Sequence, residues 1–408
     1  MSFNPLEEKG IPLEKQTRNW EQLCVEPYNN EEVHPYTRTR IILMNGIEFE
    51  ANWFGHQFSR HCSNLELKRE LAQTRRLEQQ QQKVINWLIP ANENVLEVTL
   101  GFEQVAVDLT AWLAQNEPDE EVKKALDFAL LEDFDHLYRY ANLMALTQGK
   151  KGEKIVEKLT EITPGRPTYE EHRNPKDDIR KPIDNKKADI QTKLNLLTIV
   201  AGEQQTMNFY NNVGNRPEER LGRGLYQEIA MVEEEHVTHY ESLMDPSATW
   251  AERLLLHEYN ECYLYYSMYS YETDKRIKDI WELHLNMELG HLHKAIELMK
   301  KYDNRDGRNL LPRELPEPME FKSNIDYVRK VLRNTIDYTT YGTEYINKVD
   351  LPRDNRFYSY QKSVNQGGFL PSIDVIKSMA DQKGKDYRSE VKGPNPVKRL
   401  QQQEMIPA

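Results

Sequence analysis

Acidic residues and histidines recur at fixed spacings along this chain of 408 residues. In three places a Glu is followed thirty positions later by a second acid and, three positions beyond that acid, by a His. The three sets are Glu103 with Asp133 and His136, Glu203 with Glu233 and His236, and Glu258 with Glu288 and His291. The second set lies 100 positions after the first at every member, and the third lies 155 positions after the first. This register indicates an internal repeat whose shared residues are metal ligands.

The spacing of each set suits a helical hairpin. Residues three apart lie on one face of an α-helix, so an acid-x-x-His pair directs a carboxylate and an imidazole into the same space. Two such hairpins would surround a central volume with four carboxylates and two imidazoles, and buried charges of this kind need partners. Two divalent transition-metal ions would neutralise them. Mixed nitrogen and oxygen ligation favours iron, with manganese as the alternative, over a closed zinc site.

This ligand pattern resembles that of the ferritin-like di-iron and di-manganese carboxylate proteins, in particular the rubrerythrin type. The resemblance covers about residues 92–302 and implies that the first two sets supply the six ligands of one bundle. Two features depart from the family pattern. Asp133 stands where the family usually has Glu, so this ligand is one methylene shorter. A rubredoxin-type cysteine module is absent from the sequence, which removes the electron-transfer partner of rubrerythrins.

The elements that must position these residues are helices, and the chain is predicted to be all-α. Six helices are expected to carry the three hairpins, over about residues 92–115, 118–147, 188–212, 217–244, 249–271 and 274–302. The segment 148–187, rich in Pro, Gly and charge, is predicted to be a long crossover between two parallel helices. We therefore expect the first two hairpins to form a ferritin-like four-helix bundle, with an additional antiparallel helical hairpin and flanking helices.

The expected organisation is four consecutive segments. They are an N-terminal irregular segment plus a helix (1–90), the bundle (91–246), the third hairpin (247–305) and a C-terminal helix (about 323–347) with an extended tail (306–408 in all). In the first segment, the Asn45-Gly46 turn signal predicts a strand or hairpin at 37–53, followed by a helix at 64–88. The third ligand set is half a site. Either a second subunit completes it in a homodimer, or its residues have a structural role.

Composition excludes several classes of protein. The formal net charge of −12 and the lack of a basic stripe disfavour binding to nucleic acid. No apolar stretch of about 18 residues and no signal-peptide pattern is found, which predicts a soluble cytoplasmic protein without a membrane partner. The three cysteines are far apart in the sequence, so neither a disulfide framework nor a cysteine metal ribbon is expected.

The function favoured by these patterns is that of a ferritin-like di-metal carboxylate protein. It would react with dioxygen or hydrogen peroxide as an oxidase, a peroxidase or a ferroxidase. Two alternatives stay open: a non-catalytic metal-binding protein without redox activity, and a metal-free helical scaffold. Four tyrosines lie on the same helix faces as the ligands and are expected to pack beside them, with a hydrogen bond to a ligand carboxylate or with a role as one-electron donors: Tyr140, Tyr210, Tyr240 and Tyr265.

Overall fold

A computed structural model describes residues 3–401, and within that range the chain is mostly helical. It contains fourteen α-helices, several short 3-10 helices and one sheet of two strands in this part of the chain. The predicted all-α class is therefore confirmed. Residues 1–2 of the expected N-terminal segment and 402–408 of the expected tail lie outside the described residues.

The chain forms two compact units, each assembled from segments that are distant in sequence. Unit 1 consists of Met1–Asn92, Asp184–Ala201 and Asp245–Phe321. Unit 2 consists of Glu93–Ile183, Gly202–Met244 and Lys322–Ala408. The structure thus groups the chain differently from the four consecutive segments expected from the sequence. The third hairpin shares a unit with the N-terminal segment.

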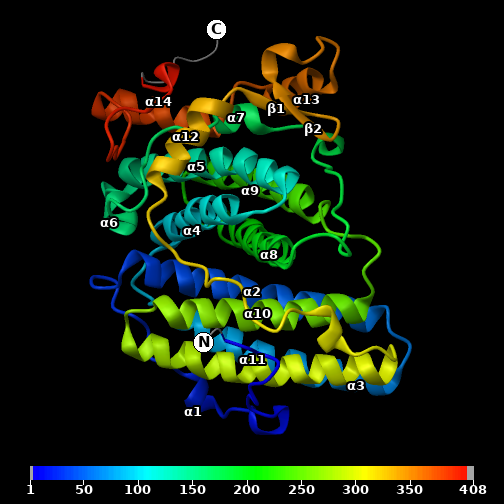
Figure 1. The fold of residues 1–408 in the computed structure, drawn as a ribbon. Helices are drawn as coiled ribbons and strands as arrows, with labels where there is room; N and C mark the ends of the chain where they lie inside the picture. Colours follow the sequence, from blue (N-terminus) through cyan, green and yellow to red (C-terminus); the bar gives the residue numbers. More distant parts are fainter. Residues whose placement is uncertain (1–2, 402–408) are drawn as a thin grey trace. The chain divides into compact units, whose positions relative to one another are not determined.

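Unit 1 is built on four long helices that lie side by side (Figure 1). They are α2 (Pro35–Arg60), α3 (Leu65–Asn86), α10 (Trp250–Tyr271) and α11 (Lys275–Tyr302). Helix α2 packs against α3 and α10, and α11 packs against α10 and α3, so the four helices close around one interior. Shorter elements of this unit are η1 (Leu13–Lys15), α1 (Trp20–Leu23) and η3 (Gly307–Leu310).

Helix α2 replaces the strand or hairpin predicted at 37–53, and that prediction was wrong. His34 accepts a hydrogen bond from the Tyr36 N–H as the N-cap, and Pro35 occupies the first helical position, so the chain starts a helix here. Buried apolar residues such as Ile41 and Met44 then stabilise it against its neighbours. Packing of this face outweighs the local turn preference of Asn45-Gly46, and Gly46 is buried inside the helix.

Unit 2 contains the other two ligand-bearing hairpins. Its long helices are α4 (Val95–Asn116), α5 (Glu120–Gln148), α9 (Arg220–Glu241) and the part of α8 (Ile190–Val213) that follows Ala201. Asn94 and Glu97 form a capping box that begins α4, and Asp119 caps α5. Helices α4 and α5 pack along their length, and α9 packs against α5. The predicted bounds of these helices agree with the structure to within a few residues.

The predicted crossover after α5 is a long connection that is buried over most of residues 160–180. It contains α6 (Glu153–Val156), α7 (Thr168–Glu171) and η2 (Pro175–Asp177). The connection approaches α5 closely at Gly165, whose N–H donates to the Asp135 carboxylate. A Cβ at Gly165 would lie 2.2 Å from the Leu131 carbonyl oxygen, so only glycine fits here. This approach brings the next residues of the crossover, including α7, against α5.

The C-terminal region is more structured than the predicted helix and extended tail. Its elements are α12 (Ile325–Thr335), β1 (Tyr338–Tyr341), β2 (Glu344–Asn347), η4 (Lys348–Asp350), α13 (Arg356–Asn365), α14 (Pro371–Lys383) and η5 (Lys398–Leu400). The helix predicted over about 323–347 ends early, because a hairpin turns at Gly342 with φ of 60°. Helix α14 packs against α5 and α9, so the tail covers unit 2 instead of remaining extended. Its apolar face (Val375, Ile376) drives this packing.

A search of the described helices for a long, sufficiently apolar segment finds none that could cross a membrane.

Candidate metal centres

Unit 2 brings the six predicted ligands of the first two hairpins together. Asp133, Glu203, Glu233 and His236 form one group, in which one ligand atom from each lies within 4.8 Å of the others. The Nδ1 atom of His236 lies 3.3 Å from Asp133 Oδ1 and 3.5 Å from both Glu203 Oε2 and Glu233 Oε2. Helices α5, α8 and α9 each contribute to this group. One imidazole therefore faces three carboxylates from three helices.

A second group in unit 2 comprises Glu103, His136 and Glu233. The Nδ1 atom of His136 lies 3.1 Å from Glu233 Oε1, and the rings of His136 and His236 are 6.0 Å apart between centroids. Glu233 belongs to both groups, with one carboxylate oxygen toward each histidine. A carboxylate placed in this way can bridge two adjacent cations.

In both histidines the outer ring nitrogen, Nε2, lies beside a carboxylate that belongs to neither ligand group. The Nε2 atom of His136 lies 3.0 Å from Glu171 Oε2, and the Nε2 atom of His236 lies 2.9 Å from Glu132 Oε2. A carboxylate on the outer nitrogen fixes the tautomer and orientation of a metal-binding imidazole. In both cases the inner nitrogen, Nδ1, is left to face the ligand groups.

Glu132 is held in turn by two buried arginines of the crossover. Arg166 donates to Glu132 Oε1 at 2.9 Å, and Arg173 donates to both carboxylate oxygens. Burial alone would raise the pKa of Glu132, but Arg173, His236 and Arg166 hold it well below its ordinary value. The Glu132 carboxylate therefore stays ionised and fixed. Glu132 and Glu171 were not among the predicted site residues, because their role depends on how the crossover folds back onto α5.

Several polar atoms of the ligand groups are buried and have no hydrogen-bond partner among the described residues. They are Glu103 Oε2, both carboxylate oxygens of Asp133 and of Glu203, Glu233 Oε2 and His236 Nδ1. Buried polar atoms are normally satisfied, so a cluster of unpaired acceptors that face one another indicates a cation. The donor set of carboxylates and imidazoles fits a transition-metal ion. These clusters are thus compatible with metal binding.

Burial and neighbouring charges shift the pKa values of the ligand side chains in the directions expected of a site that binds a cation. Burial raises the pKa of Glu103 and of Glu203 well above the ordinary value. Burial would lower the pKa of His236, but Asp133 and Glu203 raise it well above its ordinary value. The hydrogen bond with His136 and the nearby ring of His236 overcome burial and lower the pKa of Glu233 to about 2. In the protein alone, protonated imidazoles therefore supply the positive charge that the carboxylates require.

Of the predicted tyrosines, two donate to buried carboxylates. The Tyr210 hydroxyl donates to Glu103, and the Tyr265 hydroxyl donates to Glu48. Tyr140 and Tyr240 are also buried, and their hydroxyls have no hydrogen-bond partner within residues 3–401. The expected hydrogen bond to a predicted ligand carboxylate is thus present for Tyr210, whereas the partner of Tyr265, Glu48, was not among the predicted ligands.

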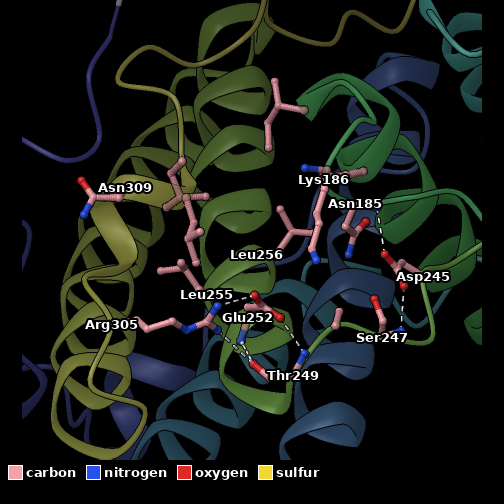
Figure 2. A pocket seen from close by; sticks show the side chains of 15 residues that line it. Asn185, Lys186, Asp245, Ser247, Thr249, Glu252, Leu255, Leu256, Arg305 and Asn309 are labelled. Atoms are coloured by element: carbon pink, nitrogen blue, oxygen red, sulfur yellow. Dashed lines mark hydrogen bonds and ion pairs between the residues drawn. The ribbon is translucent and has the colours of Figure 1, made fainter.

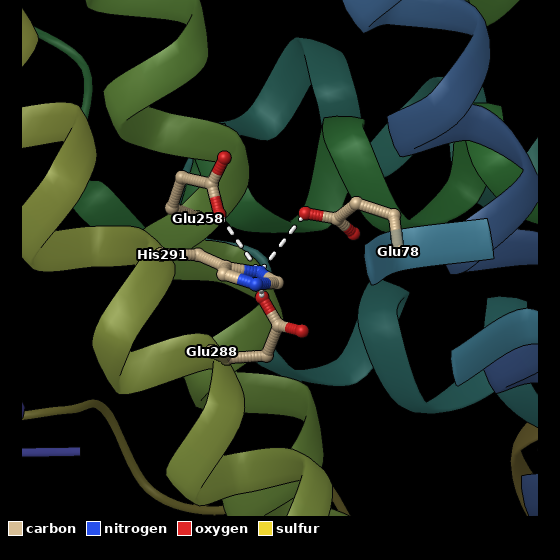
Figure 3. Close-up of side chains that lie close together, drawn as sticks. All are labelled: Glu78, Glu258, Glu288 and His291. Carbon is tan, nitrogen blue, oxygen red and sulfur yellow. Dashed lines mark hydrogen bonds and ion pairs between the residues drawn. The ribbon is translucent and has the colours of Figure 1, made fainter. Parts of the chain in front are cut away.

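Unit 1 contains a corresponding group made by the third set and by a helix near the N-terminus. Figure 3 shows Glu258, Glu288 and Glu78 directed toward the ring of His291. His291 Nδ1 lies 3.0 Å from Glu78 Oε1, 3.0 Å from Glu288 Oε2 and 3.8 Å from Glu258 Oε2. The expectation that this set is half a site within the chain was wrong, because α3 supplies Glu78. The predicted homodimer is not needed to complete the group, and it stays a prediction.

A fourth set of the repeat, missed in the sequence, explains this arrangement. Glu48 is followed thirty positions later by Glu78 and three beyond it by Gln81, each 55 positions before its counterpart in the set of Glu103. The third set lies 55 positions after the second, so the same offset relates both pairs of hairpins. The spacing of these residues indicates the fourth set, but Gln81 occupies the position that a histidine has in the other three sets.

A pocket of about 620 Å³ lies elsewhere in unit 1, near the start of α10. Figure 2 shows its polar lining, with Arg305 donating to Glu252 at 2.7 Å and Asp245 accepting from the Ser247 N–H. No member of the carboxylate groups lines this pocket. It therefore does not open onto the candidate metal centres.

Comparison with known proteins gives no match: no family model fits the chain, and neither curated proteins nor solved structures show a similarity. The ligand pattern and its geometry carry the functional argument alone.

Proposed function

We propose that unit 2 is a ferritin-like four-helix bundle that holds a pair of transition-metal ions, iron or manganese, and reacts with dioxygen or hydrogen peroxide. One observation carries the proposal. Two histidines from different hairpins direct Nδ1 toward the two oxygens of one shared carboxylate, Glu233. Structural zinc sites are usually closed tetrahedra of four ligands and have no need of a shared carboxylate between two histidines. The arrangement fits two adjacent ions that share a ligand.

The ligands of unit 2 would hold the two ions in two groups that share one carboxylate. Asp133 and Glu203 would hold one ion with His236, Glu103 would hold the other with His136, and Glu233 would join them. A pair of redox-active ions supplies two electrons to an O–O bond when it is bound here. The carboxylates would neutralise the positive charge of the two ions.

Neighbouring residues keep the ligands in place. The Tyr210 hydroxyl holds one oxygen of Glu103, and Glu132 holds the outer nitrogen of His236. The arginines behind Glu132 are themselves buried, so the orientation is fixed from inside the protein. Preorganised ligands of this kind raise metal affinity and restrict the geometry of the site.

A second function is favoured by the burial of the ligands. Glu103, Asp133, Glu233 and His236 are all 0% exposed. Such a closed site also suits a protein that holds metal for stability or buffering and does not react with oxygen. Reaction kinetics separate the two functions.

The test is stopped-flow absorption after anaerobic loading with ferrous ion. Mixing with dioxygen or hydrogen peroxide should give a near-ultraviolet ferric absorption within seconds, and His236→Ala should abolish most of it. His239→Ala is the matched control, because His239 is buried on the same helix but its Nε2 lies 2.8 Å from the Tyr345 hydroxyl. Full iron loading without oxidation would support the metal-holding function. Loading that His236→Ala leaves unchanged would overturn both.

A further inference from the structure

The cluster of unit 1 differs from that of unit 2 by the exchange of one donor. At the offset of 55 residues, Gln81 takes the position of His136, which removes an imidazole. At the same offset, Glu261 takes the position of Thr206, which adds a carboxylate. The other donors correspond in type, apart from Glu78 for Asp133. Compared with the corresponding half of the cluster in unit 2, this half of the cluster in unit 1 therefore has one imidazole fewer and one carboxylate more.

The exchanged residues meet at one place. Glu48, Glu78, Glu261 and Glu288 form a group in which one oxygen from each lies within 4.8 Å of the others. The Gln81 amide nitrogen donates to Glu288 Oε1 and, at 3.3 Å, to Glu48 Oε1. The Glu48 oxygen also accepts from the Tyr265 hydroxyl. All four carboxylates are buried, none more than 3% exposed.

Unpaired acceptors point to a ligand at this position. Among the described residues, no hydrogen-bond partner is found for Oε2 of Glu48, Glu78 and Glu261 or for Oε1 of Gln81. A cavity of about 20 Å³ adjoins Glu78, Glu258 and Glu261. That volume is enough for one water molecule or one ion, for which roughly 10–15 Å³ is needed.

The Gln81 amide cannot satisfy this group by itself. It is neutral, so its two N–H groups add no positive charge, and His291, 3.0 Å from both Glu78 and Glu288, supplies at most one positive charge for four carboxylates. A half-turn of the amide exchanges its nitrogen and oxygen, which would add a fifth oxygen donor. A cation then satisfies both the carboxylates and the amide.

We propose that unit 1 binds a second metal pair that is chemically distinct from the pair in unit 2. One position is formed by Glu78, Glu258, Glu288 and His291. The other has oxygen donors only, from Glu48, Glu78, Glu261, Glu288 and Gln81, and prefers a hard divalent cation such as manganese(II). Imidazole increases the preference for iron(II) over manganese(II), whereas carboxylates discriminate less between them. This proposal concerns a different unit from the oxygen-reactive site and does not depend on its activity.

The experiment measures metal content in a background that lacks both imidazole ligands of unit 2. The double variant His136→Ala, His236→Ala is stripped of metal and equilibrated anaerobically with equal manganese(II) and ferrous ion. Bound metals are then counted by mass spectrometry, and bound manganese is followed by its electron paramagnetic resonance signal. We expect two ions per chain, at least one of them manganese. Adding Gln81→His with Glu261→Thr should lower the bound manganese-to-iron ratio about tenfold.

The reciprocal exchange tests the same claim on the donors of unit 2. His136→Gln with Thr206→Glu, in a background carrying His291→Ala and Gln81→Ala, should raise the manganese-to-iron ratio bound by unit 2. Circular dichroism establishes that each variant is folded. One ion or none in unit 1, or a ratio that neither exchange changes, would overturn the proposal. Metal selectivity as expected without any reaction with oxygen would leave it standing and refute only the proposed function of unit 2.

Discussion

Replacing Glu132 by Gln tests whether His236 is a metal ligand whose orientation is fixed by the carboxylate at its Nε2 atom. The substitution removes a buried charge that accepts from Arg166, Arg173 and His236. Loss of one member of a buried ion pair costs about 3–5 kcal/mol, because the partner charge remains buried. Arg173 keeps its ion pairs with Asp178 and Glu235, so we expect the lower end of that range. For a unit of this size, about 3 kcal/mol lowers Tm by about 6–12 °C.

The metal affinity of unit 2 should fall as well, by about 10- to 100-fold, because the outer carboxylate orients His236. The assay combines calorimetry of the metal-free protein with metal titration at a temperature where the variant is fully folded. The matched control is Glu171→Gln, which replaces the carboxyl group beside Nε2 of His136. Burial raises the pKa of Glu171 to about 8, so its neutral amide should cost little stability at pH 7. An unchanged metal affinity in folded Glu132→Gln protein would refute the reasoning.

Three further predictions concern stability. Because burial raises the pKa of Glu171 to about 8, its contribution to stability is complete below about pH 4.5 and is lost as the pH rises through about 8. Calorimetry should therefore show the Tm of metal-free protein falling from pH 5 to 8, with manganese(II) raising Tm most at pH 8; a Tm that rises over this range would contradict it. Gly165→Ala should cost about 1–3 kcal/mol in urea unfolding, because its Cβ would meet the Leu131 carbonyl, whereas Gly149→Ala has open space but a positive φ and should cost less. Tyr210→Phe should destabilise the metal-free protein by about 1–3 kcal/mol, because it leaves a buried oxygen of Glu103 without its hydrogen-bond partner, and an effect below about 0.5 kcal/mol would count against that bond.

The helices and the six ligands of unit 2 could be predicted because both depend on local spacing. Each acid-x-x-His pair lies within one helical turn, and side chains such as Asn94 and Asp119 mark helix starts. The long crossover was also predictable from its composition. It indicated which two hairpins lie together, and the structure brings their ligands into one cluster.

The rest depends on tertiary contacts or on a hidden repeat. Glu48 and Glu78 keep the spacing of the other sets, but Gln81 conceals the motif and Asn45-Gly46 suggests a turn. All four hairpins carry similar ligands, so no single hairpin indicates that the N-terminal one (α2 and α3) pairs with the third one (α10 and α11). Glu132 acquires its role only when Arg166 and Arg173 fold back onto α5.

The most direct test of the central claim is anomalous X-ray diffraction from crystals of iron-loaded protein, recorded on both sides of the iron edge. We predict two peaks in unit 2, one among Asp133, Glu203, Glu233 and His236, and the other among Glu103, Glu233 and His136. No peak within these groups after full iron loading, or iron bound only at surface carboxylates, would contradict the account.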